Sequence, residues 1–278
     1  MSSGIIASVV APHTPRIGIE SSAPDFARGL IGGLRDLGEA LSARKPDLIV
    51  LFSSHWVSTF NWYVTAQATH EGVCVADEAP DLIPGIPYRY PGHPGFAASL
   101  AEALRSGGIP CGLNESGHFR WDYGSLVPLQ YLFPLGDLPV VLLPSVVCSD
   151  TGEARQVGQQ VDAVARAAGQ RVVFIASCAL SHQVIRGPEL WPSEAHQAMD
   201  HRLMDLVSES RAEEVIAYLP EFCQGAVAEM GGRPLSGHQG TLEAMLARGA
   251  DLKGAVFGPY TQSSGSGNAC LAFFDEKS

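Results

Sequence analysis

Basic side chains are scarce in this sequence. Its 278 residues include 18 Lys and Arg against 29 Asp and Glu, which gives a formal net charge of −11. A nucleic-acid surface needs clustered Lys and Arg to displace counterions from phosphates, so we expect no nucleic-acid partner. A few local arginines would still suffice to bind a small anion. Only 17% of the residues are charged and 46% are hydrophobic, a balance that excludes a disordered chain.

Long hydrophobic runs are also absent, since none approaches the roughly 18 residues that a membrane span requires. The N-terminal stretch MSSGIIASVVAPHTPR has no basic segment before its apolar run, so we expect a buried first strand rather than a signal peptide. The six cysteines are scattered, without a CxxC spacing and without the dense framework typical of disulfide-rich proteins. We therefore expect a reduced, cytoplasmic protein with no membrane partner.

Short apolar runs alternate with helical patterns along the chain. Runs bounded by Pro, Gly or Ser predict strands at 5–11, 47–53, 61–65, 139–144, 171–176 and 269–274. Helical spacing of apolar residues predicts helices at 25–44, 94–106, 152–168, 194–208, 211–219 and 241–248. This alternation predicts an α/β fold, with one domain over residues 1–278 and a central, mostly parallel or mixed sheet flanked by helices. The Pro/Gly-rich segment 79–95 is expected to be an irregular loop.

Three of the expected strands run into a histidine, namely His13, His55 and His182. Ligands bind at the carboxyl ends of strands in open α/β sheets, so these imidazoles share one rim if their strands are parallel neighbours. Imidazole is the commonest neutral metal ligand. Two histidines with a carboxylate would suit non-haem Fe(II) and oxygen chemistry, whereas a third histidine would indicate zinc. Acidic candidates are too many for the residues alone to select the third donor.

Two other segments invite catalytic interpretations that we consider weaker. Ser54 precedes His55, but adjacent strand residues point to opposite faces, so the two do not readily form a nucleophile–base pair. The glycine-rich stretch SSGSG at 263–267 has no Walker lysine and leads into a strand. We therefore expect it to be a tight backbone segment beside the pocket rather than a phosphate loop.

Seven stretches, in order along the chain, carry a resemblance to a known family. They are VVAPHTPR at 9–16, SSHW at 53–56, EGVCVADEAPDLIPGIPYRYPGHP at 71–94, WDYGSLVPLQYL at 121–132, IASCALSHQVI at 175–185, LPEFCQGAVAE at 219–229 and SSGSGNACLAFF at 263–274. Together they resemble the class III extradiol ring-cleaving dioxygenases, the family of the protocatechuate 4,5-dioxygenase beta subunit. The chain looks nearest to the homoprotocatechuate 2,3-dioxygenase type within that family.

The resemblance implies a set of metal ligands. The Fe(II) ligands of such enzymes map onto His13 and His55, and their third ligand maps onto Glu229 in the segment VAEMGG. The stretch MGGRPLSGHQGT that follows is longer than the family pattern, and related enzymes use a histidine as the third donor near this region. His238 therefore remains an alternative third ligand.

The resemblance also implies residues that act on the substrate. His182 in the segment LSH matches the acid–base histidine of the family, and His118 is a candidate to face the substrate or oxygen, with a solvated loop residue as the alternative. We expect Trp56 and Tyr123 to line the substrate pocket. Four arginines near the expected rim are candidates to bind a ring carboxylate, and they are Arg16, Arg89, Arg120 and Arg186, of which we expect Arg186 to bind the substrate.

The implied reaction is the opening of the aromatic ring of a catechol-type substrate by O2, beside rather than between its two oxygens. The product is of the muconic semialdehyde type and contains both atoms of O2. Three alternatives remain, namely an o-aminophenol 1,6-dioxygenase, a non-catalytic metal-binding relative and a zinc hydrolase. Relatives commonly assemble into dimers or larger complexes, so we expect a homo-oligomer.

Overall fold

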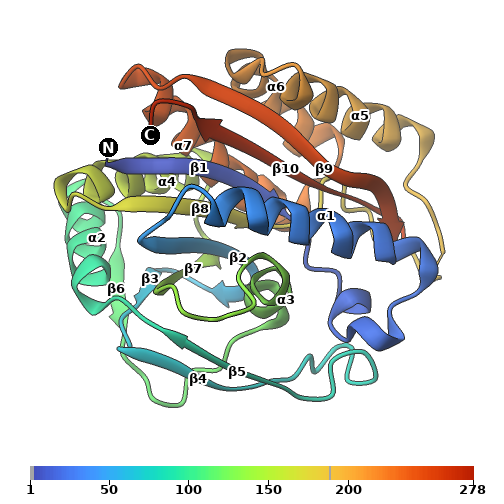
Figure 1. Cartoon of the computed structure of the whole chain (residues 1–278), viewed down its shortest axis with the longest axis horizontal. Coiled ribbons are helices and arrows are strands. Elements are labelled where there is room, and N and C mark those ends of the chain that lie inside the picture. The colour runs from blue at the N-terminus through green and yellow to red at the C-terminus, as the bar shows by residue number, and fades with distance from the viewer. Residues whose placement is uncertain (1–2, 188) are drawn as a thin grey trace.

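A six-stranded mixed sheet forms the centre of the computed structural model, which describes residues 3–187 and 189–278. Its strands are β1 (Gly4–Ala11), β2 (Leu48–Ser58), β7 (Val140–Val146), β8 (Arg171–Ser177), β9 (Leu252–Ser263) and β10 (Ser266–Asp275). They lie in the order β7-β2-β8-β1-β10-β9 (Figure 1). The first four of these strands in the order run parallel, whereas β10 is antiparallel to both β1 and β9. This is the fold class that the sequence predicts.

Helices cover both faces of this sheet. They are α1 (Asp25–Ser42), α2 (Pro94–Ser106), α3 (Tyr123–Leu132), α4 (Thr151–Ala167), α5 (Glu194–Ser208), α6 (Ala212–Gly225) and α7 (Arg233–Ala247). Alternate residues of β2 enter two separate cores: Phe52 packs with residues of α2, α4, α5, α6 and α7, whereas Leu51 packs with residues of α1 and α3. Burial on both faces explains why the strand sequences are continuously apolar.

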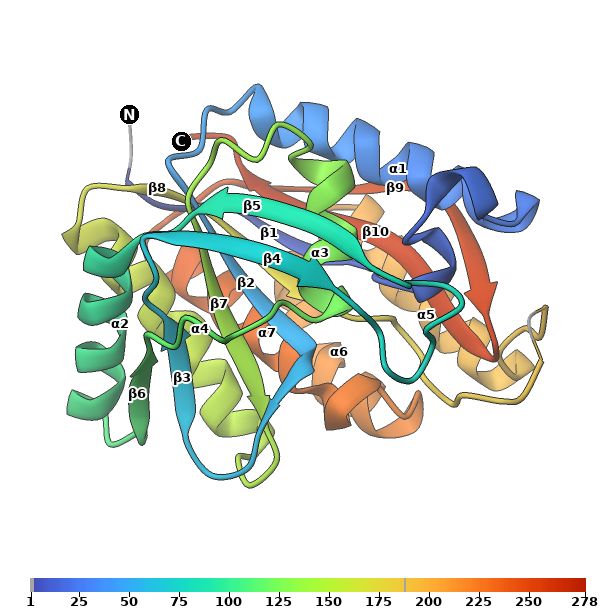
Figure 2. The same cartoon turned by 90° about the horizontal axis from the view of Figure 1, so that it is seen from below.

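The segment 79–95 contains a strand, so the expectation of an irregular loop is wrong for its second half. β4 (Thr69–Cys74) and β5 (Ile86–Pro91) pair as an antiparallel hairpin, which crosses in front of the sheet in Figure 2. The indole of Trp121 stacks on the rings of Tyr88 and Tyr90, with centroids 4.8 and 5.0 Å apart. Prolines are tolerated here because each strand of a two-stranded sheet has an outer edge that needs no N–H donor.

Other elements also differ from the expectation. The two short parallel strands β3 (Trp62–Thr65) and β6 (Cys111–Asn114) form a separate small sheet, of which only β3 was expected, and β9 was not expected. α7 begins at Arg233 rather than at Thr241. Its first turns contain glycines, which have low helix propensity and therefore gave no helical pattern in the sequence. Those glycines allow close packing, because a Cβ at Gly237 would lie 2.8 Å from a ring carbon of Phe52, and one at Gly240 would collide with the backbone of α4.

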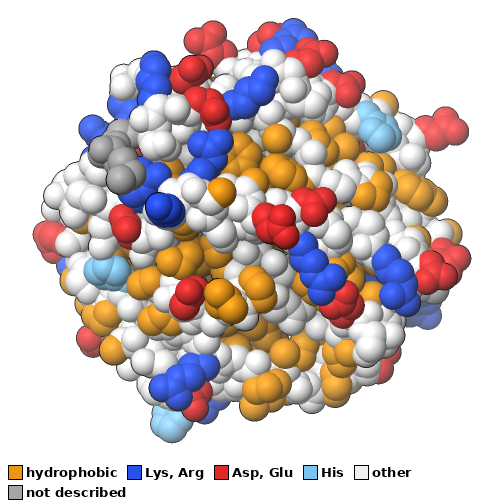
Figure 3. Space-filling model, in the orientation of Figure 1, with side chains coloured by type: hydrophobic (Ala, Val, Ile, Leu, Met, Phe, Trp, Pro, Cys, Tyr) orange, Lys and Arg blue, Asp and Glu red, His pale blue; other side chains and the backbone are white. Residues whose placement is uncertain are grey.

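The remaining features concern the lengths of the helices, the cysteines and the surface charge. Among the described residues, no helix is both long and apolar enough to cross a bilayer. All six cysteines are free thiols. Acidic and basic side chains are interspersed on the face shown in Figure 3 rather than segregated into a basic stripe.

Candidate active site

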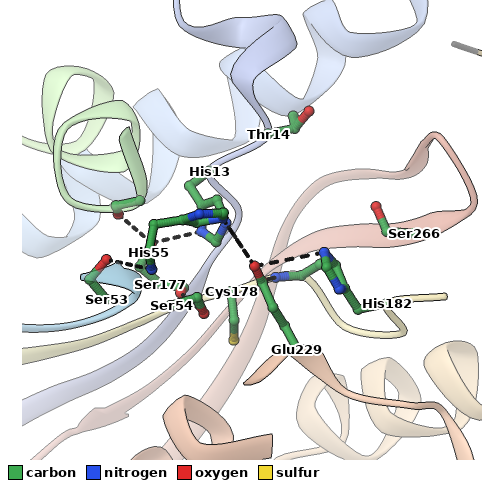
Figure 4. A network of polar contacts seen from close by, with 12 residues as sticks. His13, Thr14, Ser53, Ser54, His55, Ser177, Cys178, His182, Glu229 and Ser266 are labelled. Atoms are coloured by element: carbon green, nitrogen blue, oxygen red, sulfur yellow. Dashed lines mark hydrogen bonds and ion pairs between the residues drawn. The ribbon is translucent and has the colours of Figure 1, made fainter. Parts of the chain in front are cut away.

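Three histidines meet at one edge of the sheet because β1, β2 and β8 are parallel neighbours. His13 follows β1, His55 lies in the last part of β2, and His182 lies in the segment after β8. Figure 4 shows the three imidazoles directed toward the carboxylate of Glu229. The carboxyl ends of adjacent parallel strands thus bring together residues that are far apart in the sequence.

Glu229 supplies the carboxylate at the centre of this group. It opens the short turn η3 (Glu229–Gly232) between α6 and α7, and it is 4% exposed. Its Oε1 lies 3.2 Å from His13 Nε2, 3.3 Å from His55 Nε2 and 3.7 Å from His182 Nε2. Its Oε2 accepts a hydrogen bond of 3.0 Å from the backbone N–H of Ala179, which holds the carboxylate in place.

Hydrogen bonds determine which nitrogen of His13 carries the proton. The hydroxyl of Ser177 donates its single hydrogen to the carbonyl oxygen of Gly124 at 2.5 Å, so it can only accept from His13 Nδ1, which lies 2.9 Å away. Nδ1 of His13 is therefore protonated, and Nε2 presents a lone pair to Glu229. Two acceptors 3.2 Å apart repel one another unless a cation or a proton lies between them.

A distortion of β2 presents His55. The pairing of β2 with β7 loses its register between Phe52 and Val57, and His55 lies in this irregular stretch. The hydroxyl of Ser53 accepts hydrogen bonds from the backbone N–H groups of His55 and Trp56, and it donates to Asp122 at 2.7 Å. Asp122 also caps the N-terminus of α3. The bulge redirects the strand, as bulges beside active sites commonly do.

The three donors His13, His55 and Glu229 form a cluster that could hold a metal ion, with one ligand atom from each residue and all three atoms within 4.8 Å of one another. Burial alone would raise the pKa of Glu229, but its interactions with His13, His55 and His182 hold that pKa well below its usual value. The carboxylate is therefore ionised. An anionic oxygen with two imidazoles that present their Nε2 lone pairs is a donor set that divalent transition metals accept.

His182 stands beside the cluster rather than in it. Burial lowers its pKa, and His13 and His55 add to this effect, while Glu229 acts in the opposite direction. A neutral imidazole can accept a proton. The preceding residue Ser181 donates its backbone N–H and its hydroxyl to the buried carboxylate of Asp200, at 2.9 and 2.7 Å, which fixes this segment.

A cavity of about 430 Å³ opens above these residues, within the size range of small-molecule sites. His13, His55, His182 and Glu229 all line it, and so does Tyr123, whose ring centroid lies 4.0 Å from that of His55. The remaining wall is mixed. Its apolar members are Pro15, Ala79, Leu82, Ala179 and Val184, and its polar or charged members are Thr14, Arg16, Glu78, Ser263, Ser264, Ser266 and Asn268.

The glycine-rich stretch 263–267 forms part of this wall. It is the tight turn between β9 and β10, with φ of 49° at Ser264 and 84° at Gly265. Left-handed backbone at both central residues is the geometry of a two-residue hairpin turn. The expectation of a tight segment beside the pocket agrees with this arrangement.

Some of the expected site residues lie elsewhere. Trp56 packs against the ring of Phe119, with centroids 4.7 Å apart, and is not among the residues that line the cavity. His118 is an exposed residue of a turn in which its N–H bonds the hydroxyl of Ser116. Arg186 is exposed, and the arginine that lines the cavity is Arg16.

The alternative third ligand His238 is also remote from the cluster. It lies on the buried side of α7, where its Nδ1 is 2.7 Å from the hydroxyl of Ser8 on β1. Burial lowers its pKa to about 3. The carboxylate of Glu229 occupies the position beside His13 and His55 instead.

Two residues of the site gave no signal in the sequence. Ser177 ends β8 and looked like an ordinary strand-end serine, although it orients His13. Glu78 is one acidic residue of a loop rich in them, and its carboxylate lies 3.5 Å from His55 Nδ1. Both contact residues distant in the sequence, which no local pattern reveals.

Comparison with known proteins agrees with this geometry. Residues 8–273 match the family described as the catalytic LigB subunit of aromatic ring-opening dioxygenase. The chain belongs to this family. The assignment to the LigB family covers almost the entire chain, including both ends of the central sheet and every residue of the cluster.

Named LigB relatives share about a quarter of their residues with the chain. The 3,4-dihydroxyphenylacetate 2,3-dioxygenase of Escherichia coli is 25% identical over 73% of this chain and 76% of its own length. The 2-aminophenol 1,6-dioxygenase beta subunit of a Pseudomonas species is 26% identical over 81% of each chain. An uncharacterized protein from Escherichia coli K12 has the same fold, with a TM-score of 0.67, 18% identity and coverage of 96% of this chain and 99% of that one.

Proposed function

We propose that this LigB-family protein is an Fe(II)-dependent extradiol dioxygenase. It would use O2 to open the ring of a catechol-type substrate to a muconic semialdehyde-type product, in the breakdown of aromatic compounds. The observation that carries the proposal is the convergence of His13, His55 and Glu229 at the floor of a cavity. Two histidines and one carboxylate on one side of an ion leave open positions, the arrangement typical of non-haem Fe(II) oxygenases.

The distances within the cluster suit a single bound ion. Ligands about 2.1 Å from a metal lie roughly 3 Å apart when they occupy adjacent octahedral positions. The Nε2 atoms of His13 and His55 lie 3.2 and 3.3 Å from Glu229 Oε1. Bound Fe(II) would supply a common coordination site for substrate and O2 and a route for electron density from one to the other.

The protein itself would move the protons. His182 would accept a proton at Nε2 from one ring hydroxyl of the bound substrate and return it later to the cleaved oxygen. Burial favours its neutral, proton-accepting form by lowering its pKa. Its Nε2 lies 3.7 Å from Glu229 Oε1, so it faces the same point of the cavity as the metal donors.

The cavity wall would orient the ring. Leu82 and Val184 offer apolar contact to an aromatic face, and Tyr123 closes the side next to His55. Arg16 is the arginine of the lining, so we propose it, rather than Arg186, as the partner of a substituent carboxylate. An o-aminophenol is the second candidate substrate, because a 2-aminophenol 1,6-dioxygenase subunit is among the relatives and such a ring also presents two adjacent donors.

Reconstitution with iron tests this proposal directly. The purified protein would be stripped of metal, loaded with Fe(II) without oxygen, and mixed with O2 and a panel of catechols and aminophenols. We expect O2 consumption and a yellow ring-opened product with at least one substrate. Loaded protein that consumes no O2 with any of them would contradict the proposal, and hydrolysis supported by zinc would favour the hydrolase alternative.

We also propose that the protein is a cytoplasmic homo-oligomer. Its free cysteines suit a reducing compartment. Several large apolar side chains are exposed, among them Leu135 at 83% and Phe60 at 73%, and association would cover such groups. Light scattering during size-exclusion chromatography would give the mass of the assembly.

A further inference from the structure

One carboxylate beside the site has no part in the proposed chemistry. Glu78 lies in the loop 75–85 that joins β4 to β5, and its Oε1 is 3.5 Å from His55 Nδ1. This nitrogen is on the opposite side of the imidazole from Nε2, which faces Glu229. Glu78 therefore approaches His55 from behind the metal cluster. Its side chain is 57% exposed, whereas Glu229 is buried.

The loop that carries Glu78 is anchored at its base. Ile83 is fully buried, and a Cβ at Gly18 would lie only 2.8 Å from Ile83 Cγ1, so the loop packs closely against the chain that follows His13. The backbone N–H of Ala76 bonds the carbonyl of Ile83 at 3.2 Å, which closes the loop. A closed and anchored loop can hold a side chain at a defined position.

The same loop forms the roof of the substrate cavity, through Glu78, Ala79 and Leu82. Glu78 and His55 also line a second cavity of about 420 Å³, together with Arg120 and Asp77. Glu78 is thus shared by two cavities that both reach His55. A change in the conformation of loop 75–85 would therefore act on His55, a residue of the metal cluster.

The two metal-cluster histidines differ in what holds their Nδ1 atoms. For His13 the partner is the buried hydroxyl of Ser177, on a rigid strand. For His55 the charged partner is Glu78, on a loop, and the side chain of His55 is 26% exposed. A histidine ligand needs its second nitrogen held, because this selects the tautomer that presents the other lone pair to the metal.

We propose that Glu78 is a positioning residue for His55. Its carboxylate, 3.5 Å from His55 Nδ1, favours by charge attraction the tautomer with the hydrogen on Nδ1, so that the lone pair of Nε2 faces Glu229, and it couples loop 75–85 above the substrate cavity to metal binding. The inference rests on the proposed function only in requiring that His13, His55 and Glu229 bind a divalent metal. It assigns Glu78 no contact with the metal itself.

Metal affinity tests the proposal without reliance on turnover. The metal-free full-length protein would be titrated with Co²⁺ in a calorimeter, as wild type and as Glu78→Ala, Glu78→Gln and Asp81→Asn. Loss of an outer partner of a histidine ligand weakens binding by about tenfold or more, so we expect Glu78→Ala to show this loss. Glu78→Gln should lose less, because its amide oxygen still presents a partial negative charge to Nδ1–H. Asp81→Asn removes the same charge from the same loop, outside both cavity linings, and should bind Co²⁺ as wild type does.

The visible absorption of bound Co²⁺ supplies a second measurement. At saturating metal we expect the bands of Glu78→Ala to shift relative to wild type, because His55 is free to rotate, while those of Asp81→Asn stay unchanged. Wild-type affinity and an unshifted spectrum in Glu78→Ala would overturn the positioning role. Failure of the wild-type protein to bind Co²⁺ would instead refute the metal site and with it the proposed function.

Discussion

His13 and His238 have closely similar local surroundings in two different regions of the molecule. Both are buried, at 5% and 2% exposure, and both place Nδ1 against a serine hydroxyl on a neighbouring strand, Ser177 at 2.9 Å and Ser8 at 2.7 Å. Each serine hydroxyl donates its single hydrogen to another acceptor, so each histidine must donate from Nδ1. Ser177 donates to a backbone carbonyl, and Ser8 donates to Thr241, whose own hydrogen goes to the carbonyl of His238.

The difference lies on the other side of the ring. His13 Nε2 faces Glu229 and a cavity, whereas His238 lies inside the core between α7 and the sheet, with the ring of Phe273 6.5 Å away. Burial and one hydrogen bond therefore make a histidine rigid but do not give it a function. A second donor set and access to solvent distinguish a candidate ligand from a structural residue.

Removal of His13 should have the largest effect. Metal analysis of the reconstituted His13→Ala protein should find almost none of the roughly one ion expected per chain, and ring-opening activity should fall to background. His238→Gln is the matched control and should retain its metal. Full metal content in His13→Ala would show that His13, like His238, is not needed for metal binding.

Replacement of His182 tests the residue that stands beside the cluster. His182→Phe should keep the metal but lose turnover by a factor on the order of 10²–10⁴, because the proton of the substrate hydroxyl has no acceptor. Steady-state oxygen uptake together with metal analysis would separate the two effects. Turnover near the wild-type rate would exclude the acid–base role.

The free energy of unfolding should depend on pH through the buried side chain of His238. Its folded pKa of about 3 is below the unfolded value near 6.5, so its stabilising contribution is complete above pH 6.5 and is lost as the pH falls. Between pH 8 and 5 the free energy of unfolding should drop by about 2 kcal/mol from this residue. Denaturant titrations of His238→Gln should show a shallower pH dependence, and identical slopes for both proteins would contradict this assignment.

The two serines should give the smallest and most discriminating effects. Ser177→Ala should weaken Co²⁺ binding by about tenfold, because His13 loses the acceptor that selects its tautomer. Ser8→Ala should leave Co²⁺ affinity unchanged and lower the free energy of unfolding by about 1–2 kcal/mol. Equal metal affinities in both variants would show that Ser177 has no orienting role.

Much of the fold was predictable because strong periodic patterns coincide with elements that pack in the ordinary way. The apolar strands of the parallel half and helices such as α1 and α4 were expected near their observed positions. Elements with weak local signals were missed. β5 contains prolines, α7 contains Gly237 and Gly240, and α6 continues through Pro220 to Gly225. In each case long-range packing outweighs local propensity.

The candidate site, like the fold, was predictable only where local patterns are strong. His13, His55 and His182 were proposed from their places after strands, and the resemblance to a family added Glu229; the structure brings the four side chains together. Their roles as ligands and acid–base group remain predictions that the variants above test. His118, Trp56 and Arg186 lie outside the cavity lining, because the direction of a side chain in a loop or bulge depends on neighbours distant in the sequence.

The sequence by itself determined the class of fold, the buried strands and the histidines at their ends, because these depend on hydrophobic periodicity and on the kinds of residue that follow it. Only the tertiary structure decided that Glu229 and not His238 lies beside His13 and His55, that Arg16 and not Arg186 lines the cavity, and that Ser177 and Glu78 lie at the Nδ1 atoms of His13 and His55. Such choices depend on distances of a few ångströms between segments far apart in the chain, and no local pattern encodes them.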